Sequence, residues 1–248
     1  RGQVIVVGCD SAGGIGPKRL DKVKVDGHTL GKFTARVALM EVLSTGARPF
    51  SIVTTLSVEP KPTGTEIIRG VKHEARLAGL DPNLATIGSS EKNISTEQTG
   101  IGVTALGIAE MSTLRIGCSK AGDAVVAIGV PCFGREVLQA EREKRIAETA
   151  DLLRLLNLGY VHEVIPVGSK GILYEAKTMA KESDLKLQLA EKSRLDLRKS
   201  AGPTTVILTS IESSKVVKLS EIIKKPLCIL GHLRRIATRS CQGTTHTK

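Results

Sequence analysis

Short runs rich in β-branched residues alternate along this chain with longer segments of helical periodicity, and glycine or proline ends most of the segments. This alternation predicts a mixed α/β fold. Strands are expected at residues 3–7, 22–25, 50–58, 85–87, 101–110, 124–130, 161–165, 185–189, 204–210 and 227–230. Helices are expected at residues 30–45, 66–78, 134–158, 172–181 and 218–223. The glycine-rich segment 8–17 is expected to join the first two strands as a hairpin turn.

The 248 residues of the chain are enough for two modest domains. A turn signal, Lys120-Ala121-Gly122-Asp123, lies between two predicted strands, and we place a domain boundary there. This gives an N-terminal domain of residues 1–120 and a C-terminal domain of residues 121–248. The polar segment 239–248 is expected to fray.

Composition disfavours several classes of protein. No apolar run approaches the roughly 20 residues that cross a bilayer, and no segment has the pattern of a secretory signal, so we expect a soluble, cytoplasmic protein without a membrane partner. The five cysteines are scattered without CxxC spacing, which indicates free thiols. The net charge is +11, but the basic residues are dispersed and aromatic residues make up only 2%, which disfavours a nucleic-acid partner.

The glycine-rich segment around Asp10 is the first candidate for chemistry. Small residues such as Gly13, Gly14 and Gly16 let backbone N–H groups approach a phosphate, and a carboxylate beside them binds magnesium through oxygen. Asp26 follows the next predicted strand. A plain hairpin turn, with Asp10 as its cap, accounts for the same residues.

Glu41 is the second candidate, because it is an acid within a predicted helix that is otherwise rich in apolar and small residues. A buried carboxylate is costly unless it is paired or bound to a metal. Arg36 is a possible partner. An exposed acid on the outer face of the helix remains the alternative.

The third candidate is the polar segment Gly88-Ser89-Ser90-Glu91-Lys92-Asn93, which directly follows a short apolar strand. Ligands in α/β sheets bind beyond the carboxyl ends of strands, where this segment would lie. Its hydroxyls, carboxylate, lysine and amide suit a polyphosphate. A solvated surface loop has a similar composition.

The common nucleotide motifs are absent from the sequence. No GxxxxGK[ST] and no GxSxG occur, and the glycines of Gly13-Gly14-Ile15-Gly16 lack GxGxxG spacing. None of the five histidines has a companion at metal or triad spacing. A nucleotide site in this chain therefore requires another fold.

The ordered set of motifs resembles the aminoimidazole ribonucleotide synthetase-related, or PurM-like, superfamily. The resemblance covers most of the chain and is carried by residues 8–12, 41–49, 102–107, 121–125, 161–171, 200–203 and 229–231. Within the superfamily the sequence looks most like the α-ribazole kinases, which take part in cobamide salvage. Three stretches carry that likeness: Asp10 to Gly16, Arg36 to Glu41, and Gly88 to Asn93.

The resemblance implies a two-layer N-terminal domain that dimerises through its β-sheet, a smaller α/β C-terminal domain, and ATP with Mg²⁺ in the cleft that the homodimer creates. By position, Asp10, Glu41 and Asp26 would bind the metal, and Asp26 or Glu41 would be the catalytic base. The implied nucleotide contacts are Gly13, Gly14, Gly16, Arg36, Gly88, Ser89, Ser90, Glu91, Lys92 and Asn93. One departure is that Gly88-Ser89-Ser90 replaces the family's Gly-Gly-Asp.

Three functions follow from this resemblance. The first is an ATP-dependent kinase for a small nucleoside or phosphorylated metabolite, because carboxylates that hold magnesium are sufficient equipment for phosphoryl transfer. The second is an ATP-dependent cyclo-ligase like aminoimidazole ribonucleotide synthetase. The third is a nucleotide-binding protein without catalysis.

Overall fold

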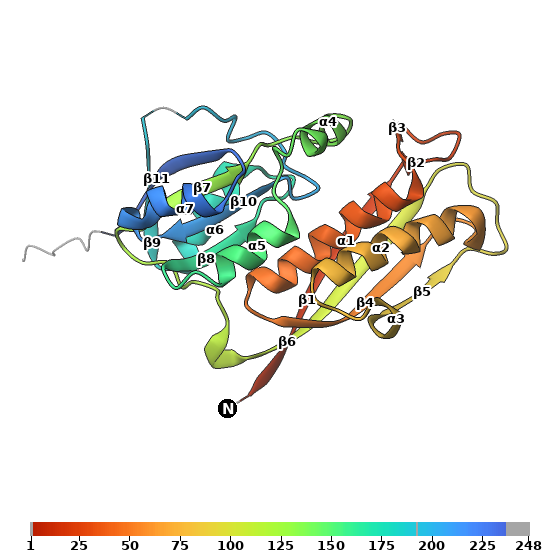
Figure 1. Ribbon diagram of the computed structural model, residues 1–248, viewed down its shortest axis with the longest axis horizontal. Coiled ribbons are helices and arrows are strands. Elements are labelled where there is room, and N and C mark those ends of the chain that lie inside the picture. The colour runs from red at the N-terminus through yellow and green to blue at the C-terminus, as the bar shows by residue number, and fades with distance from the viewer. Residues whose placement is uncertain (1, 192, 237–248) are drawn as a thin grey trace, which may run out of the picture.

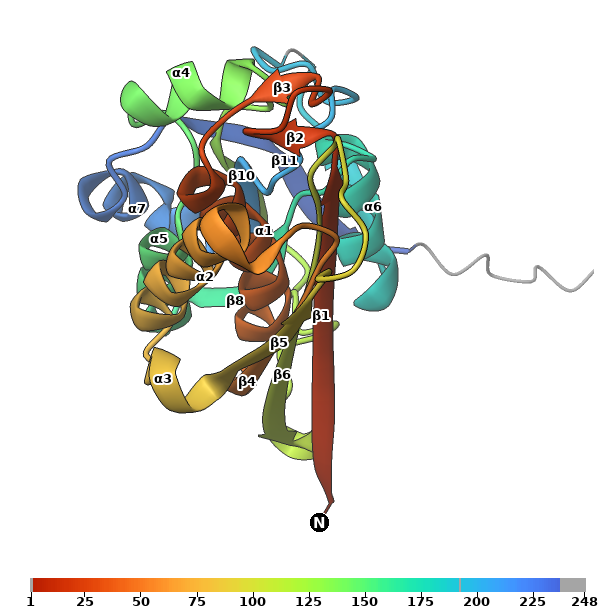
Figure 2. The same cartoon turned by 90° about the vertical axis from the view of Figure 1, so that its right-hand side faces the viewer.

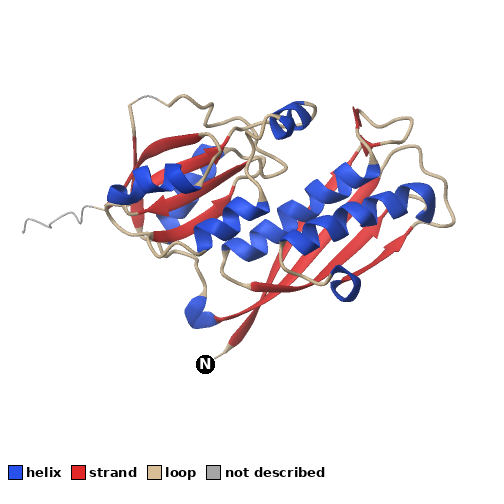
Figure 3. Cartoon of the chain, viewed as in Figure 1, coloured by secondary structure: helices blue, strands red, loops and turns tan. Residues whose placement is uncertain are grey.

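The computed structural model describes residues 2–191 and 193–236, and it contains two larger β-sheets with helices packed against them (Figures 1 and 3). The first half of the chain forms a four-stranded sheet, and the second half forms a five-stranded sheet. A mixed α/β fold was predicted from the sequence and is confirmed.

The four-stranded sheet has the strand order β1-β6-β4-β5. Its strands are β1 (Gln3–Gly13), β4 (Arg48–Leu56), β5 (Thr86–Ser90) and β6 (Gly100–Glu110). Helices α1 (Gly27–Ser44) and α2 (Thr65–Leu77) cover one face only (Figure 2). Shorter elements complete this half: β2 (Ile15–Gly16), β3 (Val23–Lys24), η1 (Pro60–Gly64), α3 (Pro82–Ala85) and η2 (Met111–Thr113).

The five-stranded sheet has the order β8-β10-β7-β11-β9. Its strands are β7 (Ala124–Gly129), β8 (Val161–Pro166), β9 (Leu185–Leu189), β10 (Val206–Ile211) and β11 (Leu227–Arg235). Helices α5 (Thr149–Leu156) and α7 (Val216–Ile222) pack on one face, and α6 (Ile172–Glu182) packs on the other. Helix α4 (Glu136–Arg142) and the short η3 (Ser213–Lys215) lie outside the sheet.

Helix α1 joins the two halves. One continuous cluster of buried side chains runs from Leu39 and Met40 of α1 to Leu152 of α5 and Val161 of β8. The far face of the five-stranded sheet has its own cluster with α6. Burial of aliphatic side chains is the main favourable term in folding, so α1 is the element through which the two halves stabilise each other.

Two glycines allow α1 and α2 to pack with their backbones in contact. A Cβ atom on Gly31 would lie 2.0 Å from the carbonyl oxygen of Ile67, and a Cβ on Gly70 would lie 2.0 Å from that of His28. No side chain larger than hydrogen fits at these distances. The close approach therefore depends on both residues being glycine.

The predicted hairpin of 3–7 with 22–25 is wrong. Strand β1 continues through the glycine-rich segment to Gly13 and pairs antiparallel with β6 along its whole length, whereas Val23 and Lys24 pair in parallel with β2. The reason is that Gly8 allows β1 to pack closely against α1 and does not form a turn, since a Cβ there would lie 2.4 Å from the Ala38 carbonyl oxygen. The sequence pattern alone predicts a turn at a cluster of glycines and does not reveal a close contact with a distant helix.

The predicted helix 134–158 is also wrong, because it is two helices, α4 and α5. The chain turns at Lys144, whose φ is +56°, and α5 then begins with a capping box between Glu148 and Asp151. Reciprocal side-chain bonds of this kind start a new helix. The two helices predicted in the first half, at residues 30–45 and 66–78, are confirmed within a few residues as α1 and α2.

The change from one sheet to the other falls between Glu110 and Ala124. The predicted boundary at residue 120 lies in this interval, but the division into two independent domains stays a prediction. The expected frayed segment 239–248 lies outside the described residues. No helix in the described ranges is long and apolar enough to cross a membrane. The described cysteines, Cys9, Cys118, Cys132 and Cys228, are free thiols.

We expect Gly70→Ala to lower the free energy of unfolding by about 1–3 kcal/mol, because the added methyl group forces α1 and α2 apart. Gly159→Ala is the matched control, since no atom lies within 4 Å of a Cβ at that position, and its effect should stay within about 0.5 kcal/mol. Urea unfolding measures both. Equal effects of the two variants would contradict the proposed backbone contact.

Candidate functional site

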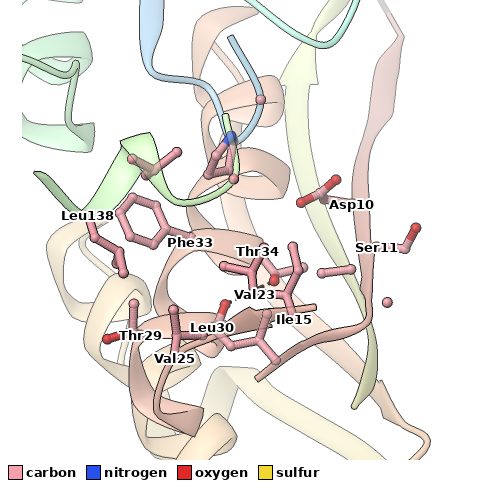
Figure 4. Close-up of a pocket in the computed structure, with 16 residues that line it drawn as sticks. Asp10, Ser11, Ile15, Val23, Val25, Thr29, Leu30, Phe33, Thr34 and Leu138 are labelled. Atoms are coloured by element: carbon pink, nitrogen blue, oxygen red, sulfur yellow. Dashed lines mark hydrogen bonds between the residues drawn. The ribbon is translucent and has the colours of Figure 1, made fainter. Parts of the chain in front are cut away.

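A cavity of about 360 Å³ lies between the two halves of the chain (Figure 4). Its walls come from the end of β1, the β2–β3 segment and the first turns of α1. The opposite wall comes from α4 and from the turn at Gly202 and Pro203 in the second half. A pocket between two parts of a chain is a frequent location for a ligand site.

The walls of this cavity are mostly apolar. The apolar side chains include Ile15, Val23, Val25, Leu30, Phe33, Val137 and Leu138, and the polar ones are Asp10, Ser11, Thr29 and Thr34. No lysine or arginine is among the lining residues. The interior therefore suits an uncharged ring better than a bare triphosphate.

Asp10 lies on the face of β1 that α1 covers, whereas Ser11 lies on the other face, and Figure 4 shows the two side chains pointing to opposite sides of the strand. Glu41 of α1 lies close by: its Oε2 accepts a hydrogen bond of 3.0 Å from the backbone N–H of Cys9. Gly8 makes this contact possible, because a Cβ there would collide with α1. The negative charge of Asp10 acts on Glu41, so two of the predicted acids lie near each other. The residue Glu41 is itself exposed, as the alternative interpretation of the sequence expected.

Both carboxyl groups are held away from their usual ionisation. Burial raises the pKa of Asp10 to about 6, and a hydrogen bond from the amide of Ser11 opposes part of this effect. Burial also raises the pKa of Glu41, and the negative charges of Asp10 and Glu175 add to that rise. Burial raises the pKa of Glu175 of α6 as well. Perturbed carboxyl groups beside a cavity are typical of functional sites.

Asp10 and Glu41 are better suited to share a magnesium ion with a bound nucleotide than to bind the ion by themselves. Within residues 2–191 and 193–236, no three histidine, cysteine, aspartate or glutamate side chains converge as a metal-binding group. Magnesium in proteins is commonly held by one or two carboxylates, with phosphate and water oxygens completing its shell. Asp10 and Glu41 have the donor chemistry for such a shared shell.

Asp26 has a different local role. It is the N-cap of α1, and its carboxylate accepts hydrogen bonds from the backbone N–H of Thr29 at 2.7 Å and from the hydroxyl of Thr29 at 3.0 Å. Burial works against its ionisation, but these bonds outweigh burial and lower its pKa. Asp26 does not line the cavity. Its predicted metal and catalytic roles stay predictions.

The predicted nucleotide contacts in the glycine-rich segment, Gly13, Gly14 and Gly16, differ in their surroundings. Gly13 lines the cavity, and Gly14 follows it with a φ of +69°. Gly16 packs against Thr99, where a Cβ would lie 2.5 Å from the Thr99 Oγ1. The buried Asp21 accepts bonds from the amide and hydroxyl of the same threonine, so this end of the segment is structural.

Arg36 is not free to reach a phosphate in this conformation. Its side chain is 3% exposed, and its Nε donates to Glu74 Oε1 at 3.1 Å. Its guanidinium also lies over the ring of Phe33, 4.8 Å from the centroid. The prediction that Arg36 pairs with Glu41 is wrong, because the pattern could not reveal Glu74 on the neighbouring helix.

The segment 88–93 lies at a different groove. Gly88, Ser89 and Ser90 belong to β5 and line a groove of about 400 Å³ against α2, which shares no residue with the Asp10 cavity. Glu91 accepts bonds from the amides of Asn93 and Ile94, and these lower its pKa. Strands β6 and β4 separate β5 from β1, a distance of about 14 Å at ordinary strand spacing. Within one chain the two predicted sites therefore stay apart.

Sequence reasoning missed the second half of the cavity. Val137, Leu138, Gly202 and Pro203 lie more than a hundred residues beyond Asp10 in the chain. No motif marks Val137 and Leu138, and the motif segment 200–203 was not assigned to the site. Glu175 was missed for the same reason. Only the packing of the two halves brings these residues to the site.

The architecture is that of the PurM-like fold. No family model and no curated protein matches the sequence. The fold is similar to that of thiamine-monophosphate kinase from Stenotrophomonas maltophilia K279a, with a TM-score of 0.64, 17% identity, and coverage of 94% of this chain and 84% of that one.

Two further solved structures were determined with bound ligands. Hydrogenase maturation protein HypE in complex with ATP has a TM-score of 0.65, 14% identity, and coverage of 94% of this chain and 78% of the other. AaThiL complexed with AMPPCP and TMP has a TM-score of 0.62, 15% identity, and coverage of 94% and 81%. At these identities the likeness establishes the fold.

At pH values above 6 we expect the Asp10→Asn variant to have a higher Tm than the parent protein. The reason is that the variant lacks a carboxylate whose ionisation is disfavoured by burial in the folded state. The folded-state pKa is about 6 and the ordinary value is 3.8, so the Tm difference should grow between pH 4 and pH 6 and stay constant above it. Thermal unfolding without added metal measures this. A lower Tm for the variant at pH 7 would show that the charged carboxylate is stabilising.

Proposed function

We propose that this protein is an ATP-dependent phosphotransferase that acts on a small molecule. The observation that carries the proposal is the location of Asp10 in the wall of an apolar cavity with Glu41 bonded to the amide of the preceding residue, Cys9, in a fold that binds ATP in HypE. The similar fold of a thiamine-monophosphate kinase favours phosphoryl transfer among the ATP-dependent reactions.

In this proposal the carboxylates and the cavity have separate tasks. Asp10 and Glu41 hold Mg²⁺, which neutralises phosphate oxygens when bound, and the backbone at Gly13 and Gly14 lies against the phosphates. The apolar wall around Phe33 and Leu138 takes an uncharged ring of a substrate. The proton of an acceptor hydroxyl would pass to whichever of Glu41 and Asp26 is free of the metal, since only an unbound carboxylate can act as a general base.

For the acceptor we propose a nucleoside of the α-ribazole type. Its support is the sequence likeness of three segments, Asp10 to Gly16, Arg36 to Glu41 and Gly88 to Asn93. An apolar cavity of about 360 Å³ is of a size to take the base of such a nucleoside.

We further propose that the protein is a homodimer through the uncovered face of the four-stranded sheet. This face carries exposed or partly exposed apolar side chains, with Thr104 and Ser51 between them: Ile5 and Val7 of β1, Leu106 and Ile108 of β6, Val53 of β4 and Ile87 of β5. Ile5 and Ile87 are 68% and 58% exposed. Apolar side chains gathered on an exposed face favour an interface. A second copy is also the means of bringing a segment 88–93 close to Asp10.

We expect Asp10→Asn and Glu41→Gln each to weaken magnesium-dependent ATP binding by at least about tenfold, because each removes a charged oxygen ligand. Glu110→Gln is the control, since Glu110 is an exposed acid at the end of β6, and it should bind as the parent does. Calorimetric titration of ATP with and without Mg²⁺ measures the effect. Parent-like binding by either site variant would exclude that residue.

The reaction is tested by incubating the protein with ATP, Mg²⁺ and a panel that includes α-ribazole, thiamine phosphate and common nucleosides. A kinase transfers the phosphoryl group, so we expect ADP and a phosphorylated acceptor in equal amounts, measured by mass spectrometry. Free inorganic phosphate with a ring-closed product would instead identify a cyclo-ligase. Tight ATP binding without ADP formation on the whole panel would indicate a protein without catalysis.

We expect Val7→Lys to convert a dimer into a monomer, because it places a charge opposite Leu106 on the uncovered face of the sheet. Val217→Lys changes a valine of α7 that is 74% exposed, against 59% for Val7, and should leave the mass unchanged. Light scattering after size-exclusion chromatography gives both masses. A parent protein with the mass of a single chain would contradict the dimer.

A further inference from the structure

Helix α4 is held by ion pairs at both ends, Glu136 with Lys199 and Glu141 with Lys32, and by a small apolar contact. It has seven residues, a length that is marginal for a helix without support from packing. Its buried side chains, Val137 and Ala140, pack in a small cluster with Phe33, Cys132 and Ile146, which is separate from the two larger clusters. Figures 1 and 2 show α4 away from both sheets, near β2 and β3.

The same helix forms part of the wall of the cavity. Val137 and Leu138 line it together with the α1 side chains Leu30 and Phe33, and Val137 packs against Phe33 in one small cluster. Residues with left-handed backbone conformation lie on both sides of α4: Gly134, with a φ of +59°, precedes it, and Lys144, with a φ of +56°, follows it. The helix is therefore bounded by sharp turns at both ends.

One ion-pair group ties α4 to α1. Glu141 Oε1 accepts from Lys32 Nζ at 2.6 Å and lies 3.8 Å from Arg36 Nη2. The side chains of Lys32 and Glu141 are only 17% and 22% exposed, and Arg36 also pairs with the buried Glu74. Two cations thus face two carboxylates, and the group is neutral.

Displacement of α4 would disturb this balance. Without Glu141, Lys32 would lose the carboxylate it is bonded to, while Arg36 would keep Glu74. The partly buried ammonium of Lys32 would then have no direct ion-pair partner within the described residues. Breaking a buried pair by removing one partner is costly. The ion pair therefore favours the position in which Val137 and Leu138 close the cavity.

We infer that α4 is a lid on the cavity and that Glu141 is the positioning residue that holds it closed on Lys32 and Arg36. The lid opens by a change at the turns around Gly134 and Lys144, and it controls entry of the ligand's apolar part. This inference concerns access to the cavity, so it does not depend on which nucleotide or acceptor binds there.

Hydrogen exchange of the ligand-free protein, read by mass spectrometry, tests the lid. In Glu141→Gln we expect the segment 134–147 to exchange at least about tenfold faster than in the parent, while α1 and α5 keep their rates. Glu143→Gln is the matched control, because Glu143 follows α4 directly but bonds only to Gln139 and Arg145, and it should exchange as the parent does. Lys32→Gln, which removes the partner on α1, should reproduce the effect of Glu141→Gln.

If the exchange of segment 134–147 is unchanged in both Glu141→Gln and Lys32→Gln, Glu141 does not hold the lid closed and the inference is wrong. Faster exchange throughout the chain would overturn it as well, since Glu141 would then contribute to overall stability rather than to one helix. The experiment contains no nucleotide, so its failure leaves the ATP-binding test unaffected, and failure of ATP binding leaves this result standing.

Discussion

The close packing of α1 against β1 and α2 is the constraint on which the rest of the structure depends. Gly8 lets the helix come near enough for Glu41 to accept a hydrogen bond from the amide of Cys9. Asp10 follows Gly8 on the face of the strand that lies under α1. On its other side, α1 is fixed to α2 at Gly31. Because one helix is held by backbone contacts on two sides, the carboxylates, the cavity wall and the ion pairs that it carries have fixed relative positions.

The charged groups on α1 and on the strand beneath it fall into two kinds. Arg36 and Lys32 have their charges balanced by carboxylates from α2 and α4, as structural ions do. Asp10 and Glu41 form no salt bridge within the described residues, and burial disfavours their ionisation. A protein keeps uncompensated carboxyl groups at a cost in stability, which is reasonable where a cation is to be bound.

The sequence predicted the elements well and their partners poorly. The α1 and α2 segments were found because apolar spacing and terminal glycines are local signals, and Asp10 and Glu41 were singled out because an acid among small residues is unusual. The course of β1 was missed, because the contact that requires Gly8 is with a helix thirty residues away. Arg36 was assigned to the wrong partner for the same reason. The far wall of the cavity depends on tertiary packing: Leu138 has no local signal, and the motif that contains Pro203 does not reveal that it faces Asp10.

The two faces of strand β1 carry different kinds of side chain. Even-numbered residues such as Asp10 lie under α1, and odd-numbered ones such as Val7 lie on the uncovered side of the sheet. Since side chains alternate strictly along a strand, inserting or deleting one residue before Asp10 would exchange the two sets. The carboxylate would move to the uncovered side of the sheet, and Cys9 or Ser11 would take its place under α1. The side chains proposed for chemistry and those proposed for self-association thus alternate along one strand of eleven residues, and a change of register would displace both sets.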